Sequence, residues 1–232
     1  MEKKPVLLTV LDVLTAAVFI LATGMVFLYA PMEAVMGWVQ KVFYFHVSAG
    51  WVGMLGFLVA AVAGIAYLRS KHQKWDGVGL AGVEIGLVFM LICIITGAIW
   101  ARPIWNTWWT WDPRLTTATI MELVYAAYLM LRSGIDDPEK RARFGAIYAI
   151  IGFASVPLTF ISIRLFRTIH PVVIGSSDPS AVGAFDMSAR MSQTFFFSLF
   201  AFSILFADLL WHRIRLSKLE EQVDHLKMEL YQ

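Results

Sequence analysis

The apolar segments of this sequence are long enough to cross a lipid bilayer, and they constrain the fold more than any other feature. A helix needs about 20 mainly apolar residues to span roughly 30 Å of hydrocarbon. Hydrophobic residues make up 59% of the chain and charged residues 16%, whereas a soluble domain is about half apolar and a quarter charged. The sequence therefore predicts an all-α integral membrane protein with six transmembrane helices. The predicted spans are residues 6–29, 47–68, 77–99, 116–131, 144–163 and 192–211.

Lysine and arginine are distributed unevenly between the two sides of this predicted bundle. Thirteen of the 19 basic residues fall on the side of the termini, and six fall in the three loops on the other side. Because basic residues concentrate on the cytoplasmic side, we expect both termini in the cytoplasm. The loops at residues 30–46, 100–115 and 164–191 then face outward. We expect one transmembrane domain over residues 1–212 and a short charged cytoplasmic helical tail over residues 213–232.

The sequence lacks the motifs of several common active sites. Its single cysteine, Cys93, excludes an internal disulfide, a CxxC redox pair and a CxxCH covalent haem site. It contains no Walker A sequence, no GxGxxG after a predicted strand and no HExxH. A net charge of +2 gives no indication of nucleic-acid binding. The first apolar segment has no obvious small-residue cleavage site, so we expect a retained helix and not a signal peptide.

The second outer loop reads WARPIWNTWWTWDPRLT from residue 100 to residue 116. Tryptophans at the ends of spans usually anchor a helix at the headgroup level, but this loop has more than anchoring requires. We expect the clustered indoles to lie flat and make a broad planar apolar platform, and Arg102 and Arg114 at its edges can hold anions. Such a platform suits a large flat ligand that carries carboxylates, and haem fits this description. The tryptophans are Trp100, Trp105, Trp108, Trp109 and Trp111.

Two of the five histidines lie on the same side as this tryptophan loop. Haem iron takes axial ligands, and a neutral imidazole is a common one. His46 ends the first outer loop and His170 lies in the third, so they can approach a flat ligand from opposite faces. Lys41, Arg164 and Arg167 lie nearby, and an anionic ligand or lipid phosphates would explain their positive charge. The other histidines, which we expect to be solvated and without a role, are His72, His212 and His225.

The run WNTWWTWDPRLT resembles the WWD domain signature, typically WGxWWxWDPRLT, of the haem-handling membrane proteins of c-type cytochrome assembly. The chain length, the six predicted spans and the two outer histidines are similar to the haem exporter protein C (CcmC) family over essentially the whole chain. Two positions depart from the pattern. Asn106 replaces the usual glycine, although asparagine tolerates the left-handed conformation. Ser48 stands where proline is common, which leaves the start of the local helix undefined.

The resemblance implies a role for each candidate residue. His46 and His170 would be the axial ligands of a non-covalently bound haem b. The haem platform would consist of Trp100, Trp105, Trp108, Trp109, Trp111 and Asp112. The propionates would contact Arg114, Arg102, Lys41, Arg164 and Arg167.

The resemblance also implies a function. Such a protein holds haem at the periplasmic face of the bacterial cytoplasmic (inner) membrane and presents it to the haem chaperone CcmE for c-type cytochrome biogenesis. It belongs to a haem export complex with the CcmA/CcmB ABC transporter and the small membrane protein CcmD. No loop residue looks like a nucleophile or a general acid, so we expect a haem carrier and not an enzyme. Such a carrier assists covalent attachment of haem to the chaperone by positioning.

Three other functions are compatible with the residues. Glu84 and Glu122 lie within predicted spans, where carboxylates are costly and often functional, so one alternative is a proton- or ion-coupled transporter. The broken helices and inverted repeat of such transporters are missing from the sequence. We therefore expect Glu84 and Glu122 to be neutral, hydrogen-bonded acids between helices, and we expect replacement of either by glutamine to leave haem binding largely intact. An electron-transfer cytochrome b is the second alternative, but it usually holds haem between helices inside the membrane. The third is a structural subunit whose tryptophans only anchor it.

The predicted tail carries apolar residues at the 3-4-3-4 spacing of a coiled-coil seam. Two heptads are short for that pattern. The tail is therefore interpreted either as a solvated extension of the last span or as a docking site for a partner subunit. The apolar positions are Leu216, Leu219, Val223, Leu226 and Leu230.

Overall fold

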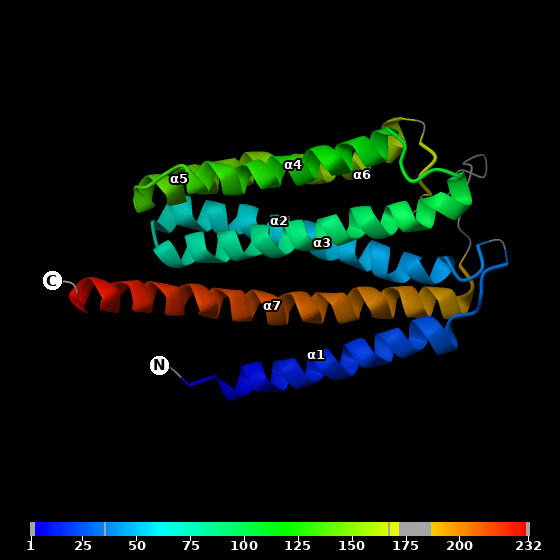
Figure 1. Ribbon diagram of the computed structural model, residues 1–232, viewed down its shortest axis with the longest axis horizontal. Helices are drawn as coiled ribbons and strands as arrows, with labels where there is room; N and C mark the ends of the chain where they lie inside the picture. The colour runs from blue at the N-terminus through cyan, green and yellow to red at the C-terminus, as the bar shows by residue number, and fades with distance from the viewer. Residues whose placement is uncertain (1–2, 35, 167, 172–186, 231–232) are drawn as a thin grey trace.

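In the computed structural model, the regular structure of the described residues is helical, and the helices run along one long axis (Figure 1). The described residues are 3–34, 36–166, 168–171 and 187–230. The elements are α1 (Val6–Gly24), the π-helical turn η1 (Met25–Tyr29), α2 (Gln40–Ser70), α3 (Gln73–Trp105), α4 (Pro113–Ser133), α5 (Pro138–Gly152), α6 (Ser155–Leu165) and α7 (Ala189–Leu230). Both termini lie at one end of the bundle, and the tryptophan loop between α3 and α4 lies at the other (Figure 1).

Five helical segments among the described residues are long and apolar enough to cross a membrane. An all-helical membrane protein is therefore confirmed. The fourth predicted span corresponds to α4, which has 21 residues and carries Glu122 among several threonines, and these polar groups lower its hydropathy. Six spans and their orientation stay predictions. The five segments are Val6–Tyr29, Gln40–Ser70, Gln73–Trp105, Pro138–Leu165 and Ala189–Glu220.

Neither of the last two predicted spans is a single helix of the predicted length. The fifth consists of α5 and α6, which are separated by a turn at Phe153 and Ala154. The sixth continues without a break into the predicted tail, because α7 is one helix of 42 residues.

At the start of the tail, Arg213 donates two hydrogen bonds to the carboxylate of Glu84 on α3, at 2.6 and 3.0 Å. The expectation of a neutral acid is therefore wrong for Glu84, which forms an ion pair between helices.

Helices α2 and α3 extend farther toward the tryptophan loop than predicted. α2 begins at Gln40 and not at residue 47, and α3 continues to Trp105 and not to residue 99. Phe43 in the added turns of α2 stacks on Phe195 of α7, with ring centroids 5.6 Å apart. This burial stabilises helical turns that are too polar to be predicted as membrane spans. The left-handed backbone of Asn106 (φ 54°) ends α3, and asparagine tolerates this conformation at the position where the family pattern has glycine.

Glycines bring α2 and α3 into backbone contact. A Cβ atom on Gly56 would lie 2.5 Å from the carbonyl oxygen of Gly82 and 2.8 Å from the Cα atom of Gly86. A Cβ atom on Gly82 would lie 2.7 Å from the carbonyl oxygen of Gly56. In a membrane such close packing is a main source of helix association, because lipid is as apolar as the side chains. α2 and α3 therefore form the central pair of the bundle, against which α4, α5 and α7 pack.

Replacement of Gly56 by alanine should destabilise the protein, because the added methyl group meets backbone atoms that move only if the helices separate. We expect the free energy of unfolding to fall by about 1–3 kcal/mol, the usual range for overpacking, and the thermal midpoint in detergent to fall with it. Gly77→Ala is the matched control, since a Cβ atom there would meet nothing within 4 Å. Equal midpoints for the two variants would contradict the close contact.

Candidate functional site

A cavity of about 350 Å³ opens among α2, α3, α4, α6 and α7, next to the tryptophan loop. Its walls are mainly apolar and include the predicted platform residues Trp100, Trp105, Trp108 and Trp109. An apolar cavity with a few convergent polar groups is typical of a ligand-binding site. The charged and imidazole side chains that line it are His46 from α2, Arg114 from α4, Arg164 from α6 and His170 from the connection between α6 and α7.

His46 and His170 meet in this cavity. Their ring centroids lie 6.4 Å apart, and the ring planes are inclined at 42°. Nδ1 of His46 lies 2.8 Å from the carbonyl oxygen of Cys93, and Nδ1 of His170 lies 3.0 Å from that of Pro171. A carbonyl oxygen only accepts, so each Nδ1 carries the proton and donates. Each Nε2 is then left with a lone pair, which is the tautomer that binds a metal through Nε2.

Gly97 on α3 makes room for the ring of His46. A Cβ atom on Gly97 would lie 2.8 Å from Cε1 and 3.2 Å from Nδ1 of His46. Cys93 lies one turn before Gly97, so α3 supplies both the space for the ring and the acceptor for its Nδ1 proton. Gly97 could not be predicted as a site residue, because no local motif marks a glycine that faces a side chain of another helix.

Asp112 links His170 to the tryptophan loop. Its Oδ1 accepts a hydrogen bond from the backbone N–H of Leu115 at 2.9 Å and so caps α4. Its Oδ2 accepts a hydrogen bond from the hydroxyl group of Thr168. The hydroxyl oxygen of Thr168 in turn accepts from the backbone N–H of His170 at 3.1 Å. One carboxylate thus holds both the start of α4 and the segment that carries His170. Thr168 is a second site residue that no local sequence motif indicates.

Burial, together with the nearby positive charge of Arg114, lowers the pKa of His170 to about 3. His170 is therefore neutral at physiological pH and keeps its lone pair. The side chain of Arg114, on α4, is held against α6, because its Nη1 donates a hydrogen bond to the carbonyl oxygen of Thr159 at 2.6 Å. Its guanidinium carbon also lies 5.2 Å from the ring centroid of Phe160, within cation–π range. These contacts fix a positive charge in the cavity wall.

The tryptophans do not form one flat platform. Trp100 and Trp105 meet edge to face, with centroids 5.4 Å apart and planes at 89°, and Trp109 and Trp111 do so at 5.7 Å and 80°. The expected planar arrangement is therefore wrong, because aromatic rings prefer to place a positive edge on a negative face. Trp105 lies 6.5 Å from the ring of His170. The buried indole N–H groups of Trp100 and Trp109 have no hydrogen-bond partner among the described residues.

The five basic residues predicted to contact an anionic ligand lie in different surroundings. Arg114 and Arg164 line the cavity. Lys41 is buried away from the cavity wall and donates to a backbone carbonyl of the α1–α2 connection at 2.6 Å. Arg102 is exposed and bonds to a side chain at the end of its own helix. Arg167 lies outside the described residues.

Glu84 and Glu122, the two glutamates in predicted spans, do not line this cavity either. Glu84 is bound to Arg213. Glu122 on α4 is partly buried, and its Oε2 has no hydrogen-bond partner among the described residues. The cavity is therefore built from histidine, arginine and tryptophan, and not from carboxylates.

Comparison with known proteins gives consistent matches over most of the chain. The model of the CcmC family, described as "Heme exporter protein C", matches residues 2–229. The heme exporter protein C of Bradyrhizobium diazoefficiens is 31% identical over 92% of this chain and 80% of its own length. That of Escherichia coli K12 is 29% identical over 86% of this chain and 80% of its own length. A ccmC-like mitochondrial protein of cytochrome c biosynthesis from Marchantia polymorpha is 28% identical over 71% of this chain and 66% of its own length.

The family match covers every element that surrounds the cavity, and the apolar helices agree with a protein that crosses the membrane several times. The resemblance seen in the tryptophan loop is thereby confirmed, and the chain belongs to the CcmC (haem exporter protein C) family of multi-pass membrane proteins.

Proposed function

We propose that this chain binds haem b non-covalently in the cavity, at the periplasmic face of the bacterial inner membrane, and presents it to the haem chaperone CcmE for c-type cytochrome biogenesis. In this proposal the chain is a carrier subunit and not an enzyme, and it works with the CcmA/CcmB ABC transporter and CcmD. Relatives named as heme exporters, and one named for cytochrome c biosynthesis, support the process. The uneven distribution of basic residues supports the orientation.

The pair of cavity histidines carries the proposal. A metal–nitrogen bond is about 2 Å long and an imidazole centroid lies about 1.2 Å behind its nitrogen, so two imidazoles on opposite sides of one metal have centroids about 6.4 Å apart. His46 and His170 have this separation. Both Nδ1 protons are committed to backbone carbonyls, which leaves Nε2 of each ring for the metal. The residues therefore fit axial ligation of a haem iron from α2 and from the α6–α7 connection.

The remaining wall of the cavity fits the rest of the ligand. The apolar side chains can cover the macrocycle. Arg114 and Arg164 supply positive charge for the propionates, because guanidinium pairs well with carboxylate. The unpartnered indole N–H groups of Trp100 and Trp109 can donate to a propionate oxygen. We leave Lys41 and Arg102 out of this proposal, since neither lines the cavity.

The arrangement favours presentation over catalysis. Two axial histidines would leave the haem iron without an open coordination position, which limits its reaction with oxygen. His46 and His170 orient the ligand, while Trp108 and Trp111, which are 59% and 73% exposed, lie where a chaperone can approach. The contribution of the chain to covalent attachment is then to position haem against its acceptor.

The visible spectrum of the purified protein tests the axial ligands. We expect a six-coordinate b-type spectrum that changes in His46→Ala and in His170→Ala, because each variant removes one ligand. The double variant should retain less than about a tenth of the haem, since ligand loss costs metal sites at least one to two orders of magnitude in affinity. His72→Ala is the control, because His72 is exposed between α2 and α3. A spectrum that is unchanged in the double variant would place the ligands elsewhere.

Variants of Asp112 and Thr168 test the tether of His170. Thr168→Val removes the tether alone, whereas Asp112→Ala removes the tether and the cap of α4. Both should lower haem occupancy several-fold, because His170 is no longer held in place. Asp112→Ala should also lose about 1 kcal/mol of stability, the usual cost of a lost cap. Thermal midpoints measured without haem separate the two effects, and normal haem occupancy in Thr168→Val would contradict the tether.

Trp111→Ala tests whether the exposed part of the tryptophan loop serves delivery. Trp111 does not line the cavity, so the haem spectrum should stay unchanged. Transfer of haem to purified chaperone should slow several-fold, because an exposed aromatic anchor at an interface commonly contributes about 1–2 kcal/mol or more. Trp38→Ala is the control, with a similarly exposed indole (66%) in the α1–α2 connection. Equal transfer rates for the two variants would remove Trp111 from the docking surface.

A further inference from the structure

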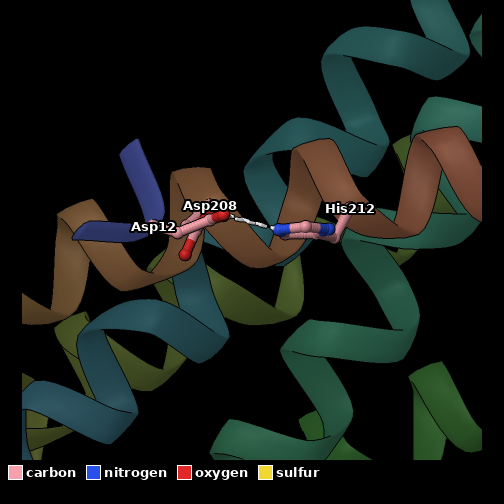
Figure 2. Close-up of side chains that lie close together, drawn as sticks. All are labelled: Asp12, Asp208 and His212. Atoms are coloured by element: carbon pink, nitrogen blue, oxygen red, sulfur yellow. Dashed lines mark hydrogen bonds and ion pairs between the residues drawn. The ribbon is translucent and has the colours of Figure 1, made fainter. Parts of the chain in front are cut away.

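Three ionisable side chains meet between the first and last helices, away from the cavity. Asp12 lies in the second turn of α1, while Asp208 and His212 lie on α7. Asp208 and His212 are four residues apart, so they share one face of α7. Figure 2 shows the imidazole edge of His212 directed at the two carboxylates. Asp12 is near the start of α1, and the N-terminus lies at the end of the bundle opposite the tryptophan loop (Figure 1).

The distances in this cluster resemble those between ligands of one metal ion. Nε2 of His212 lies 2.8 Å from Oδ1 of Asp12 and 3.6 Å from Oδ1 of Asp208. One ligand atom from each residue can be chosen so that all three lie within 4.8 Å of one another. Ligand atoms about 2.1 Å from a shared metal are about 3.0 Å apart at right angles and about 3.4 Å apart at the tetrahedral angle. Small side-chain rotations therefore bring the three residues to ligand positions.

Asp208 supplies independent evidence for a bound cation. The residue is only 8% exposed, and its Oδ1 has no hydrogen-bond partner among the described residues. The 3.6 Å separation from His212 is too long for a hydrogen bond. His212 can form an ion pair with this oxygen only when the imidazole is protonated. A buried carboxylate oxygen without a hydrogen bond is costly, and more so within a membrane-spanning helix. A cation held between Asp208, Asp12 and His212 would remove this cost.

We propose that Asp12, Asp208 and His212 form a binding site for a first-row divalent transition metal ion such as Zn²⁺. One imidazole nitrogen with two carboxylate oxygens is a ligand set that such ions accept, and two carboxylates balance the charge of a divalent ion. The imidazole of His212 is 45% exposed, which gives the ion a route to the site. Lys4 bonds to the other oxygen of Asp12, Oδ2, and leaves Oδ1 facing His212. The metal would tie α1 to α7, the helix on which α1 chiefly packs.

Zinc binding to the full-length protein in lipid nanodiscs tests the site. The parent protein for this test carries no histidine tag and has His46 and His170 replaced by alanine, so that zinc cannot bind to the cavity histidines. After equilibration with Zn²⁺ and removal of excess, metal analysis should find about one zinc per chain. Asp208→Asn and His212→Ala should each weaken zinc binding by about 100-fold, because each removes a ligand. Zn²⁺ should also raise the thermal midpoint of the parent protein and not that of these variants.

Two matched variants control for general effects of charge and histidine loss. His72→Ala removes an exposed histidine, and Glu84→Gln removes a carboxylate that is paired with Arg213; both should bind zinc as the parent does. Asp12→Asn provides a third ligand variant in case either α7 variant fails to fold. The proposal would be wrong if the parent bound less than a tenth of an equivalent of zinc, or if the folded ligand variants bound zinc as tightly as the parent. The cluster would then be an ion-pair network without a metal. Neither result depends on whether the cavity binds haem.

Discussion

The close packing of α2 against α3 is the contact on which the candidate site depends. Glycines at the middle of both helices bring the backbones together, with Gly56 of α2 against Gly82 and Gly86 of α3. Because helices are stiff, this contact sets the spacing of the pair as far as the tryptophan loop. There the ring of His46 lies on Gly97, and its Nδ1 proton meets the carbonyl oxygen of Cys93. A side-chain orientation near the outer end of the pair thus follows from backbone contacts several turns away.

A second constraint acts on His170, which lies in a connecting segment and not in a packed helix. Such segments have few apolar contacts to hold them, so hydrogen bonds must define their position. Asp112 performs this task twice. It caps α4, and it accepts a hydrogen bond from the hydroxyl group of Thr168, whose oxygen in turn accepts a hydrogen bond from the backbone N–H of His170. The two histidines are therefore positioned by different physics. His46 is placed by helix packing, and His170 is placed by one carboxylate.

Much of the architecture could be predicted because its signals are local. Apolar runs of span length predicted the helices, and Asn106 adopts the left-handed conformation that asparagine tolerates in place of glycine. The predicted helix ends were less accurate at α2 and α3, since their outer turns are stabilised by contacts such as Phe43 on Phe195. The neutral acid expected at Glu84 was wrong for the same reason. Its partner Arg213 is 129 residues away in the chain, and no local pattern records that proximity.

The sequence by itself determined the chemistry that is available to this protein. It specified apolar helices for a membrane, one loop crowded with tryptophan, and histidines on either side of that loop. The tertiary structure alone decided which of these groups meet. It joined His46 and His170 in one cavity and kept Arg114 and Arg164 in its wall, but it committed Lys41 to a backbone carbonyl and turned the indoles edge to face. The physical reason is that residue type sets what a side chain can bind, whereas packing between distant segments sets what it can reach.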